Sequence, residues 1–135
     1  MKINQLAKLT NVPSKTIRYY EEIALLPKAI RNSSGYREYN PSDVDNLVFI
    51  RRCRELQMPI EKIKKLILLQ IDKSSSCYEV DQLITQQLVK IQTTIKELSL
   101  LESTLQTLST SCSNSIVGEC KILENLTKKV ATPDN

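Results

Sequence analysis

Three cysteines, Cys77, Cys112 and Cys120, lie at the two ends of a long segment without glycine or proline, in a chain that has no histidine. The segment from Tyr78 to Ser111 can form one helix, which at ~1.5 Å per residue would separate Cys77 from Cys112 by roughly 50 Å. One chain therefore cannot bring the three sulfurs to one ion. Two chains can if these helices pair antiparallel, because Cys77 of one chain then lies beside Cys112 and Cys120 of the other. The spacing predicts a homodimer with a metal site at each end.

Three thiolates without imidazole favour soft ions, because sulfur ligands select Cd(II), Pb(II), Hg(II), Zn(II) or Cu(I) over hard cations. Zinc prefers four ligands and would need water, Glu119 or a backbone group as the fourth. A two-coordinate Cu(I) site would use Cys112 and Cys120 alone and leave Cys77 idle. We therefore expect Cd(II) or Pb(II), with Zn(II) and Hg(II) as alternatives. The fourth cysteine, Cys53, lies on a helix of the basic half, and core packing is its preferred interpretation.

The long segment carries apolar residues at alternating steps of four and three, which is the heptad pattern of a coiled coil. This seam comprises Ile84, Leu88, Ile91, Ile95 and Leu98, and continues through Glu102 and Leu105. A buried helix of a monomeric bundle is the alternative, but no second helix of similar length is available to pack against. We expect an antiparallel coiled-coil dimerisation helix over residues 77–111, followed by a metal-binding loop and short terminal helix over residues 112–130.

Charge divides the chain into two unlike halves. Residues 1–75 carry 14 Lys and Arg against 8 Asp and Glu, whereas residues 76–135 carry 5 against 7. A basic half suggests a nucleic-acid partner, although a solvated, lysine-rich surface is the alternative. The N-terminus has no signal-peptide core, and no segment approaches the length of a membrane span. A cytoplasmic location with reduced thiols and no membrane partner follows as the expectation.

The chain has only two glycines and one phenylalanine, which argues against a loop-rich or all-β fold and favours one dominated by α-helices. Within it, residues 1–71 are expected to form a winged helix-turn-helix domain. Two short helices, Ile3 to Leu9 and Lys15 to about Ile23, are joined by a polar turn, with Ser14 as the N-cap of the second. We expect the second helix to expose side chains suited to a DNA groove. These side chains are Lys15, Thr16, Arg18, Tyr19 and Tyr20.

An Asn-Ser-Ser-Gly turn separates two short stretches, Lys28 to Arg31 and Tyr36 to Tyr39, which predict a hairpin. The hairpin is similar to a DNA-binding wing, and a polar surface hairpin is the alternative. The side chains at or near its tip are Arg31, Tyr36 and Arg37. Two further helices follow, from Pro41 to Met58 and from Ile60 to about Ile71, before a polar linker over residues 72–76.

With these elements the chain resembles the MerR family of metal-responsive transcription regulators over essentially its whole length, and most closely its cadmium- and lead-responsive branch (CadR and PbrR). The matching runs are Thr16-Ile17-Arg18-Tyr19-Tyr20-Glu21, Gly35-Tyr36-Arg37-Glu38-Tyr39 and the loop from Cys112 to Leu126. The resemblance implies that Cys112 and Cys120 are loop ligands and that the partner supplies Cys77. Copper-type members have Ser where this chain has Cys77. The alternative is thus a metal-independent or copper-type regulator in which Cys77 is no ligand.

The resemblance also implies partners and a mechanism. The dimer would bind double-stranded promoter DNA in which the spacer between the two polymerase elements is too long. Metal binding would make the dimer bend and untwist this DNA, which realigns the two elements for RNA polymerase. The expected function is activation of a heavy-metal resistance promoter. Metal storage would explain the thiols but not the basic half. Nothing in the sequence indicates an enzyme, because it has no histidine and no carboxylate pair or nucleophile–base set.

Overall fold

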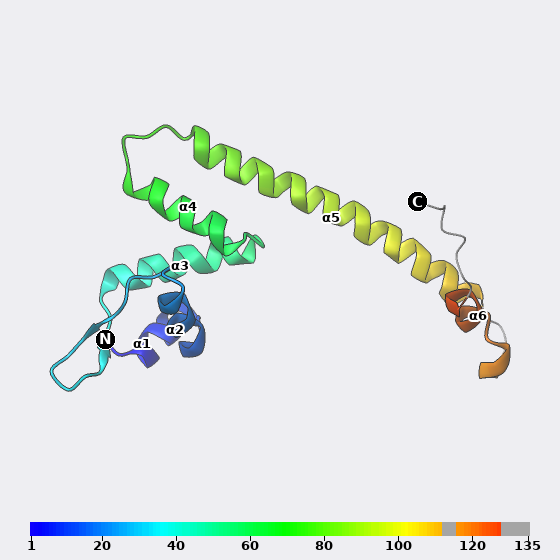
Figure 1. Ribbon diagram of the computed structural model, residues 1–135, viewed down its shortest axis with the longest axis horizontal. Coiled ribbons are helices and arrows are strands. Elements are labelled where there is room, and N and C mark those ends of the chain that lie inside the picture. Colours follow the sequence, from blue (N-terminus) through cyan, green and yellow to red (C-terminus); the bar gives the residue numbers. More distant parts are fainter. Residues whose placement is uncertain (112–115, 128–135) are drawn as a thin grey trace. The chain divides into compact units, whose positions relative to one another are not determined.

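The computed structural model describes residues 1–111 and 116–127 (Figure 1). The elements in chain order are α1 (Ile3–Thr10), α2 (Ser14–Glu22), β1 (Ile30–Arg31), β2 (Arg37–Glu38), α3 (Pro41–Glu55), α4 (Ile60–Ile71), α5 (Tyr78–Ser111), a 3-10 helix η1 (Val117–Glu119) and α6 (Lys121–Thr127). This order confirms the predicted fold class, a mostly helical chain with a small hairpin and one long helix. The chain divides into two compact units, Met1–Ile84 and Thr85–Asn135, and each is described by itself.

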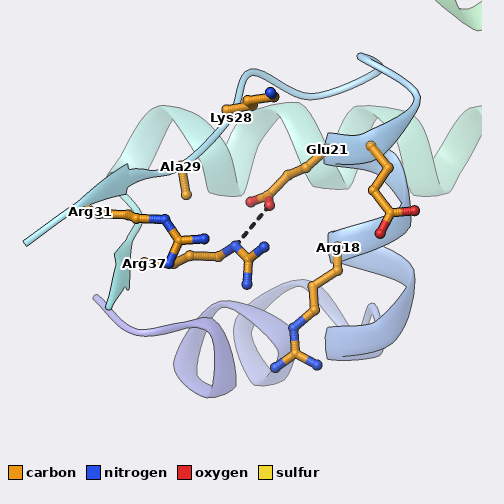
Figure 2. Close-up of a pocket in the computed structure, with 7 residues that line it drawn as sticks. Arg18, Glu21, Lys28, Ala29, Arg31 and Arg37 are labelled. Carbon is orange, nitrogen blue, oxygen red and sulfur yellow. Dashed lines mark ion pairs between the residues drawn. The ribbon is translucent and has the colours of Figure 1, made fainter. Parts of the chain in front are cut away.

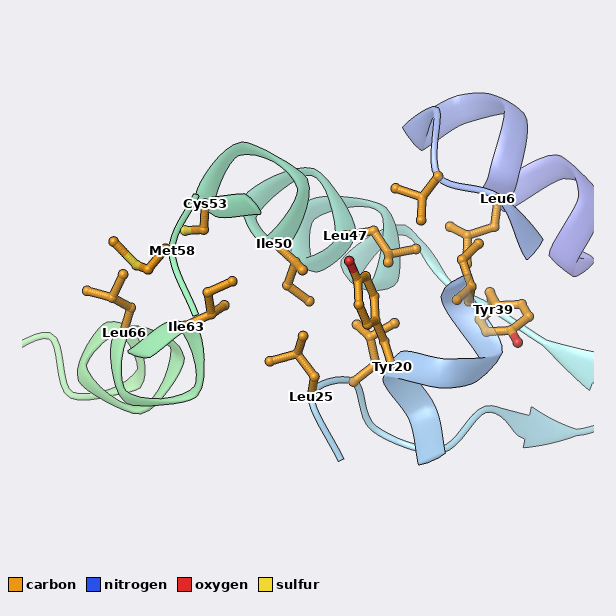
Figure 3. Close-up of a cluster of buried hydrophobic side chains, with 13 residues drawn as sticks. Leu6, Tyr20, Leu25, Tyr39, Leu47, Ile50, Cys53, Met58, Ile63 and Leu66 are labelled. Atoms are coloured by element: carbon orange, nitrogen blue, oxygen red, sulfur yellow. The ribbon is translucent and has the colours of Figure 1, made fainter. Parts of the chain in front are cut away.

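The first unit is built around one cluster of buried apolar side chains (Figure 3). Helix α1 packs against α2 and α3, and α3 packs against α4. The largest fully buried apolar side chains are Leu6, Ile17, Leu47, Ile50, Met58 and Ile63. Val80 and Leu83, in the first turns of α5, also pack against this cluster. The compact unit therefore reaches into α5, beyond the predicted end of the DNA-binding domain at residue 71.

The ends of the helices follow from local backbone chemistry. Helix α3 begins after Asn40, whose Oδ1 accepts the Asp43 N–H at 3.2 Å, while Asp43 Oδ2 accepts the Asn40 N–H at 2.9 Å. This reciprocal pair is a capping box and satisfies two otherwise unpaired donors. Helix α2 differs from the expectation, because Pro13 is its N-cap and Ser14 lies in its first turn. Pro13 has φ −58° and ψ 144°, an extended conformation compatible with its fixed φ, so helical geometry begins at Ser14 and the predicted Ser14 cap is wrong.

Helix α5 is continuous over 34 residues, as the absence of glycine and proline predicts. None of its side chains is buried in the single chain. Four seam residues are more than half exposed, namely Leu88, Ile95, Leu98 and Leu105. Most of the seam is therefore exposed in the described part of the single chain. Within the described part of the chain, no helix has the length and apolar character needed to cross a bilayer.

Candidate functional site

The first two helices form a helix-turn-helix whose turn is fixed by backbone contacts. Thr10 is buried, and its Oγ1 donates a 2.8 Å hydrogen bond to the Leu6 carbonyl. Asn11 then adopts a left-handed conformation with φ 56° and ψ 36°, which asparagine tolerates better than most residues. The Val12 N–H donates back to the Ala7 carbonyl at 3.3 Å. This compact turn sets the direction in which α2 leaves α1.

Helix α2 buries one face and exposes the other. Lys15, Arg18 and Tyr19 are exposed and Thr16 is half-buried, which agrees with the predicted outer face. Tyr20 is only 8% exposed and belongs to the hydrophobic core. Its predicted exposure is therefore wrong. The reason is helical phase, because a residue three positions after buried Ile17 lies on the same face of the helix.

The hairpin of β1 and β2 forms in the predicted region but has shorter strands. Ile30 pairs with Glu38, and Arg31 pairs with Arg37, in antiparallel register. This register sets two arginines opposite each other on adjacent strands. Both line a hollow beside α2.

The tip of the hairpin is held together by the Asn32 side chain. Its Oδ1 accepts N–H groups from Ser34 at 2.9 Å and Tyr36 at 3.1 Å. Gly35 has φ 83°, a backbone conformation that favours glycine. Arg31 Nη1 donates to the Gly35 carbonyl at 2.8 Å. The closed tip leaves Tyr36 65% exposed, and the Lys2 ammonium lies 5.8 Å from the centre of its ring.

A buried carboxylate connects α2 to the hairpin (Figure 2). Glu21 is 6% exposed, and its Oε2 lies 3.2 Å from Arg37 Nε. Its Oε1 accepts a 2.6 Å hydrogen bond from the Tyr39 hydroxyl. Burial, and next the hydrogen bond to Glu21, raise the pKa of Tyr39 well above its ordinary value. Glu21 is not among the site residues predicted from the sequence, although its position four residues after the inward-facing Ile17 indicates the same face of the helix.

Around this ion pair lies a hollow of about 290 Å³ between α2 and the hairpin. Its lining residues are Arg18, Glu21, Glu22, Lys28, Ala29, Arg31 and Arg37. Four of these side chains are cationic and two are carboxylates, so the hollow has a net charge of two positive units. Guanidinium groups around an open, positively charged hollow suit an anion such as a phosphate group.

The predicted metal ligands are only partly within the described residues. Cys77 is exposed and directly precedes α5, and its carbonyl accepts the Asp81 N–H at 2.8 Å. Cys120 is half-buried and follows η1, and its carbonyl accepts the Glu124 N–H at 3.1 Å. Cys112 lies outside the described residues. Among those that are described, no three Cys, Asp or Glu side chains of one chain are grouped to hold an ion.

Cys53, the remaining cysteine, is 7% exposed and belongs to the hydrophobic core. This confirms the prediction that it packs in the core. Burial raises the pKa of its thiol, which disfavours the thiolate that would bind a metal ion.

Two family models match this chain. Residues 1–69 match the MerR HTH family regulatory protein model, and residues 44–108 match a second model described as MerR, DNA binding. The chain belongs to the MerR family. It is accordingly a DNA-binding transcription regulator, and the prediction that it is not an enzyme is confirmed by its relatives.

Similar proteins of this MerR family cover nearly the whole chain. An HTH-type transcriptional regulator of Pseudomonas aeruginosa is 40% identical over 93% of this chain and 96% of its own length. The regulator ZntR of Escherichia coli K12 is 34% identical over 93% of this chain and 91% of its own length. The crystal structure of PbrR691 from Ralstonia metallidurans in complex with lead(II) superposes with a TM-score of 0.82, at 35% identity over 93% of this chain and 98% of that one.

Proposed function

We propose that this MerR-family regulator is a metal sensor that binds promoter DNA as a homodimer and activates transcription when a soft ion binds. Each site would consist of Cys112 and Cys120 of one chain with Cys77 of the other. The observation that carries this proposal is that Cys77 directly precedes the start of α5 and Cys120 follows its end. A helix of that length with an uncovered apolar seam requires a partner, and an antiparallel partner would bring the two ends together.

The chemistry of the donor set supports a soft metal ion. Cys77 and Cys120 are free thiols with solvent access, so they are available for ligation. Three thiolates and no histidine fit Cd(II) or Pb(II) best, with Zn(II) and Hg(II) as alternatives. Similar structures support such a choice, since one is described in complex with lead(II) and another, MerR from Bacillus megaterium, in complex with mercury(II).

The DNA side of the proposal rests on α2 and the hairpin, which would act as recognition helix and wing. The side chains proposed to contact DNA are Lys15, Thr16, Arg18, Tyr19, Arg31, Tyr36 and Arg37. Tyr20 is left out because it is a core residue. A similar MerR regulator is described bound to promoter DNA, and another, EcmrR, is described in a complex with DNA and RNA polymerase. RNA polymerase is therefore the further partner proposed. A cytoplasmic location belongs to the same proposal.

The decisive experiment mixes two variants that each lack part of the site. One is Cys77→Ser and the other combines Cys112→Ser with Cys120→Ser. After joint refolding, the heterodimer has one complete trithiolate site, because one chain supplies Cys77 and the other supplies the loop pair. We expect a cadmium titration, followed by thiolate-to-metal absorption, to show a tight site in the mixture and in neither variant alone.

Two controls separate the outcomes of this experiment. Cys53→Ser should bind cadmium like the parent protein, because this thiol is buried in the core. A mixture without a tight cadmium site would contradict ligation across the dimer. If Cys77→Ser alone binds cadmium like the parent and responds to Cu(I) or Ag(I), then Cys77 is not a ligand and the copper-type alternative is correct.

A further inference from the structure

Glu21 is a carboxylate buried on the inner face of α2 and bonded through both oxygens. A buried carboxylate is unfavourable unless charged or hydrogen-bonding groups compensate for its lost hydration. Arg37 compensates one oxygen at 3.2 Å, and the Tyr39 hydroxyl compensates the other at 2.6 Å. Both partners belong to the β2 strand and the residues directly after it. The carboxylate therefore joins the wing to the recognition helix through two contacts.

Tyr39 is fixed independently of Glu21. It is 6% exposed, and its N–H donates to the Met1 carbonyl at 2.8 Å. The Met1 ammonium donates to the Tyr39 carbonyl at 2.7 Å. Because these backbone bonds hold Tyr39 in place, its hydroxyl fixes the position of Glu21 Oε1. Glu21 Oε2 is thereby also held in place, as the acceptor for Arg37 Nε.

Arg37 can satisfy Glu21 and an outside anion together. Its side chain is 35% exposed, and the ion pair uses Nε. No other bond of this side chain is present in the described part of the chain, so its two Nη groups remain for a further acceptor. They line the same hollow as Arg18 and Arg31 (Figure 2). A planar guanidinium permits this double use, whereas a lysine ammonium is a single point of charge.

We infer that Glu21 is a positioning residue for DNA recognition, which acts by orienting the Arg37 guanidinium toward the DNA backbone in register with Arg18. This inference rests on the proposed DNA surface. Phosphate contacts fix the register of a protein on the duplex, and base contacts read the sequence only when that register is correct. Glu21 also brings a negative charge to a basic surface. Its removal should therefore reduce discrimination between sequences without reducing general attraction to DNA.

The test compares Glu21→Gln, Arg37→Gln and the double variant in the full-length protein. Two duplexes of equal length serve as probes, one selected by the parent protein from a randomised pool and one of mixed sequence. We expect Glu21→Gln to weaken binding to the selected duplex by roughly tenfold, the equivalent of one charge-assisted hydrogen bond. Binding to the mixed duplex should be no weaker than that of the parent. The double variant should bind the selected duplex as Arg37→Gln does, because Glu21 acts through Arg37.

Glu22→Gln is a matched control. Glu22 is exposed and lines the same hollow, and its replacement by Gln removes one negative charge, as Glu21→Gln does. It should keep the parent affinity for the selected duplex or bind slightly more tightly. Equal losses in Glu21→Gln and Glu22→Gln would overturn the inference. Additive losses in the double variant would overturn it as well, since they would mean that Glu21 does not act through Arg37.

A second variant keeps the test decisive if Glu21→Gln does not fold. Arg37→Lys keeps the charge at a partly exposed position but cannot serve Glu21 and a phosphate together. We expect it to lose about as much affinity for the selected duplex as Arg37→Gln, with an unchanged circular dichroism spectrum. Parent-like binding by Arg37→Lys would overturn the inference about Glu21 but leave the proposed function intact. If the parent protein selects no sequence from the pool, both the inference and the proposed function are overturned.

Discussion

Tyr39 donates a 2.6 Å hydrogen bond to the buried carboxylate of Glu21 across 18 positions of sequence. Burial and this bond raise the pKa of Tyr39 above its ordinary value of 10.0. The folded state therefore retains the phenolic proton more strongly than the unfolded state does. The resulting stabilisation is complete below pH 10 and is lost as the pH rises through the alkaline range.

The first prediction concerns Tyr39→Phe. At neutral pH it should lower the free energy of unfolding by about 1.5–3 kcal/mol, the contribution typical of a hydrogen bond to a charged group. Above pH 10 the parent should lose stability more steeply than the variant, since only the parent has this phenol. Urea unfolding at a series of pH values measures both effects. Parallel pH profiles would contradict the assigned role of Tyr39.

The second prediction concerns the seam of α5. Leu88 and Val89 are 54% and 55% exposed in the single chain, yet only Leu88 lies on the seam. Leu88→Asp should therefore weaken dimerisation strongly, whereas Val89→Asp should leave it nearly unchanged. Sedimentation equilibrium of the two variants distinguishes seam burial from a general effect of charge. A parent protein that is monomeric at micromolar concentration would contradict the proposed dimer.

A third prediction follows from the burial of Cys53. A variant with serine at residues 77, 112 and 120 retains this thiol alone. It should react slowly with a thiol reagent in the folded state and rapidly in urea, because burial disfavours its thiolate. A variant that instead keeps only the exposed Cys77 should react quickly in both conditions. Similar folded-state rates for the two thiols would contradict the core position of Cys53.

The fourth prediction concerns the ionic strength dependence of DNA binding. Arg18→Ala should weaken binding to the selected duplex and reduce the slope of log K against log salt by about 0.9, the value for one lost phosphate contact. The matched control is Lys90→Ala, which removes an exposed cation from α5. Fluorescence anisotropy over a range of salt concentrations measures both slopes. An unchanged slope for Arg18→Ala would mean that this residue makes no phosphate contact.

The helices could be predicted because local rules determine them. Helix α4 begins at Ile60 and ends at Ile71, as proline and the polar linker indicated, and α5 extends over the segment without glycine or proline. The outer face of α2 also followed from helical phase, except at Tyr20. At Tyr20 the prediction followed the residue type, which suits a DNA contact, although its position three residues after Ile17 indicates the buried face.

The bond between Glu21 and Tyr39 could not be predicted in the same way. Helical phase indicates that Glu21 faces inward, but the partners that make the burial of a carboxylate favourable are brought close only by the whole fold. The metal site stays a prediction for a different reason. It requires a second chain, and Cys112 lies outside the described residues.

If the proposed dimer covers the exposed seam of α5, the folding of this helix depends on the protein concentration. Most of the stability of a helix in a protein comes from packing rather than from intrinsic propensity. In the described part of the single chain no side chain of α5 is buried, and in the proposed dimer the partner's helix would supply the missing packing. Its helicity should therefore fall on dilution, while the compact first unit keeps its structure. The concentration of the regulator in a cell would then determine what fraction of its molecules has a folded α5.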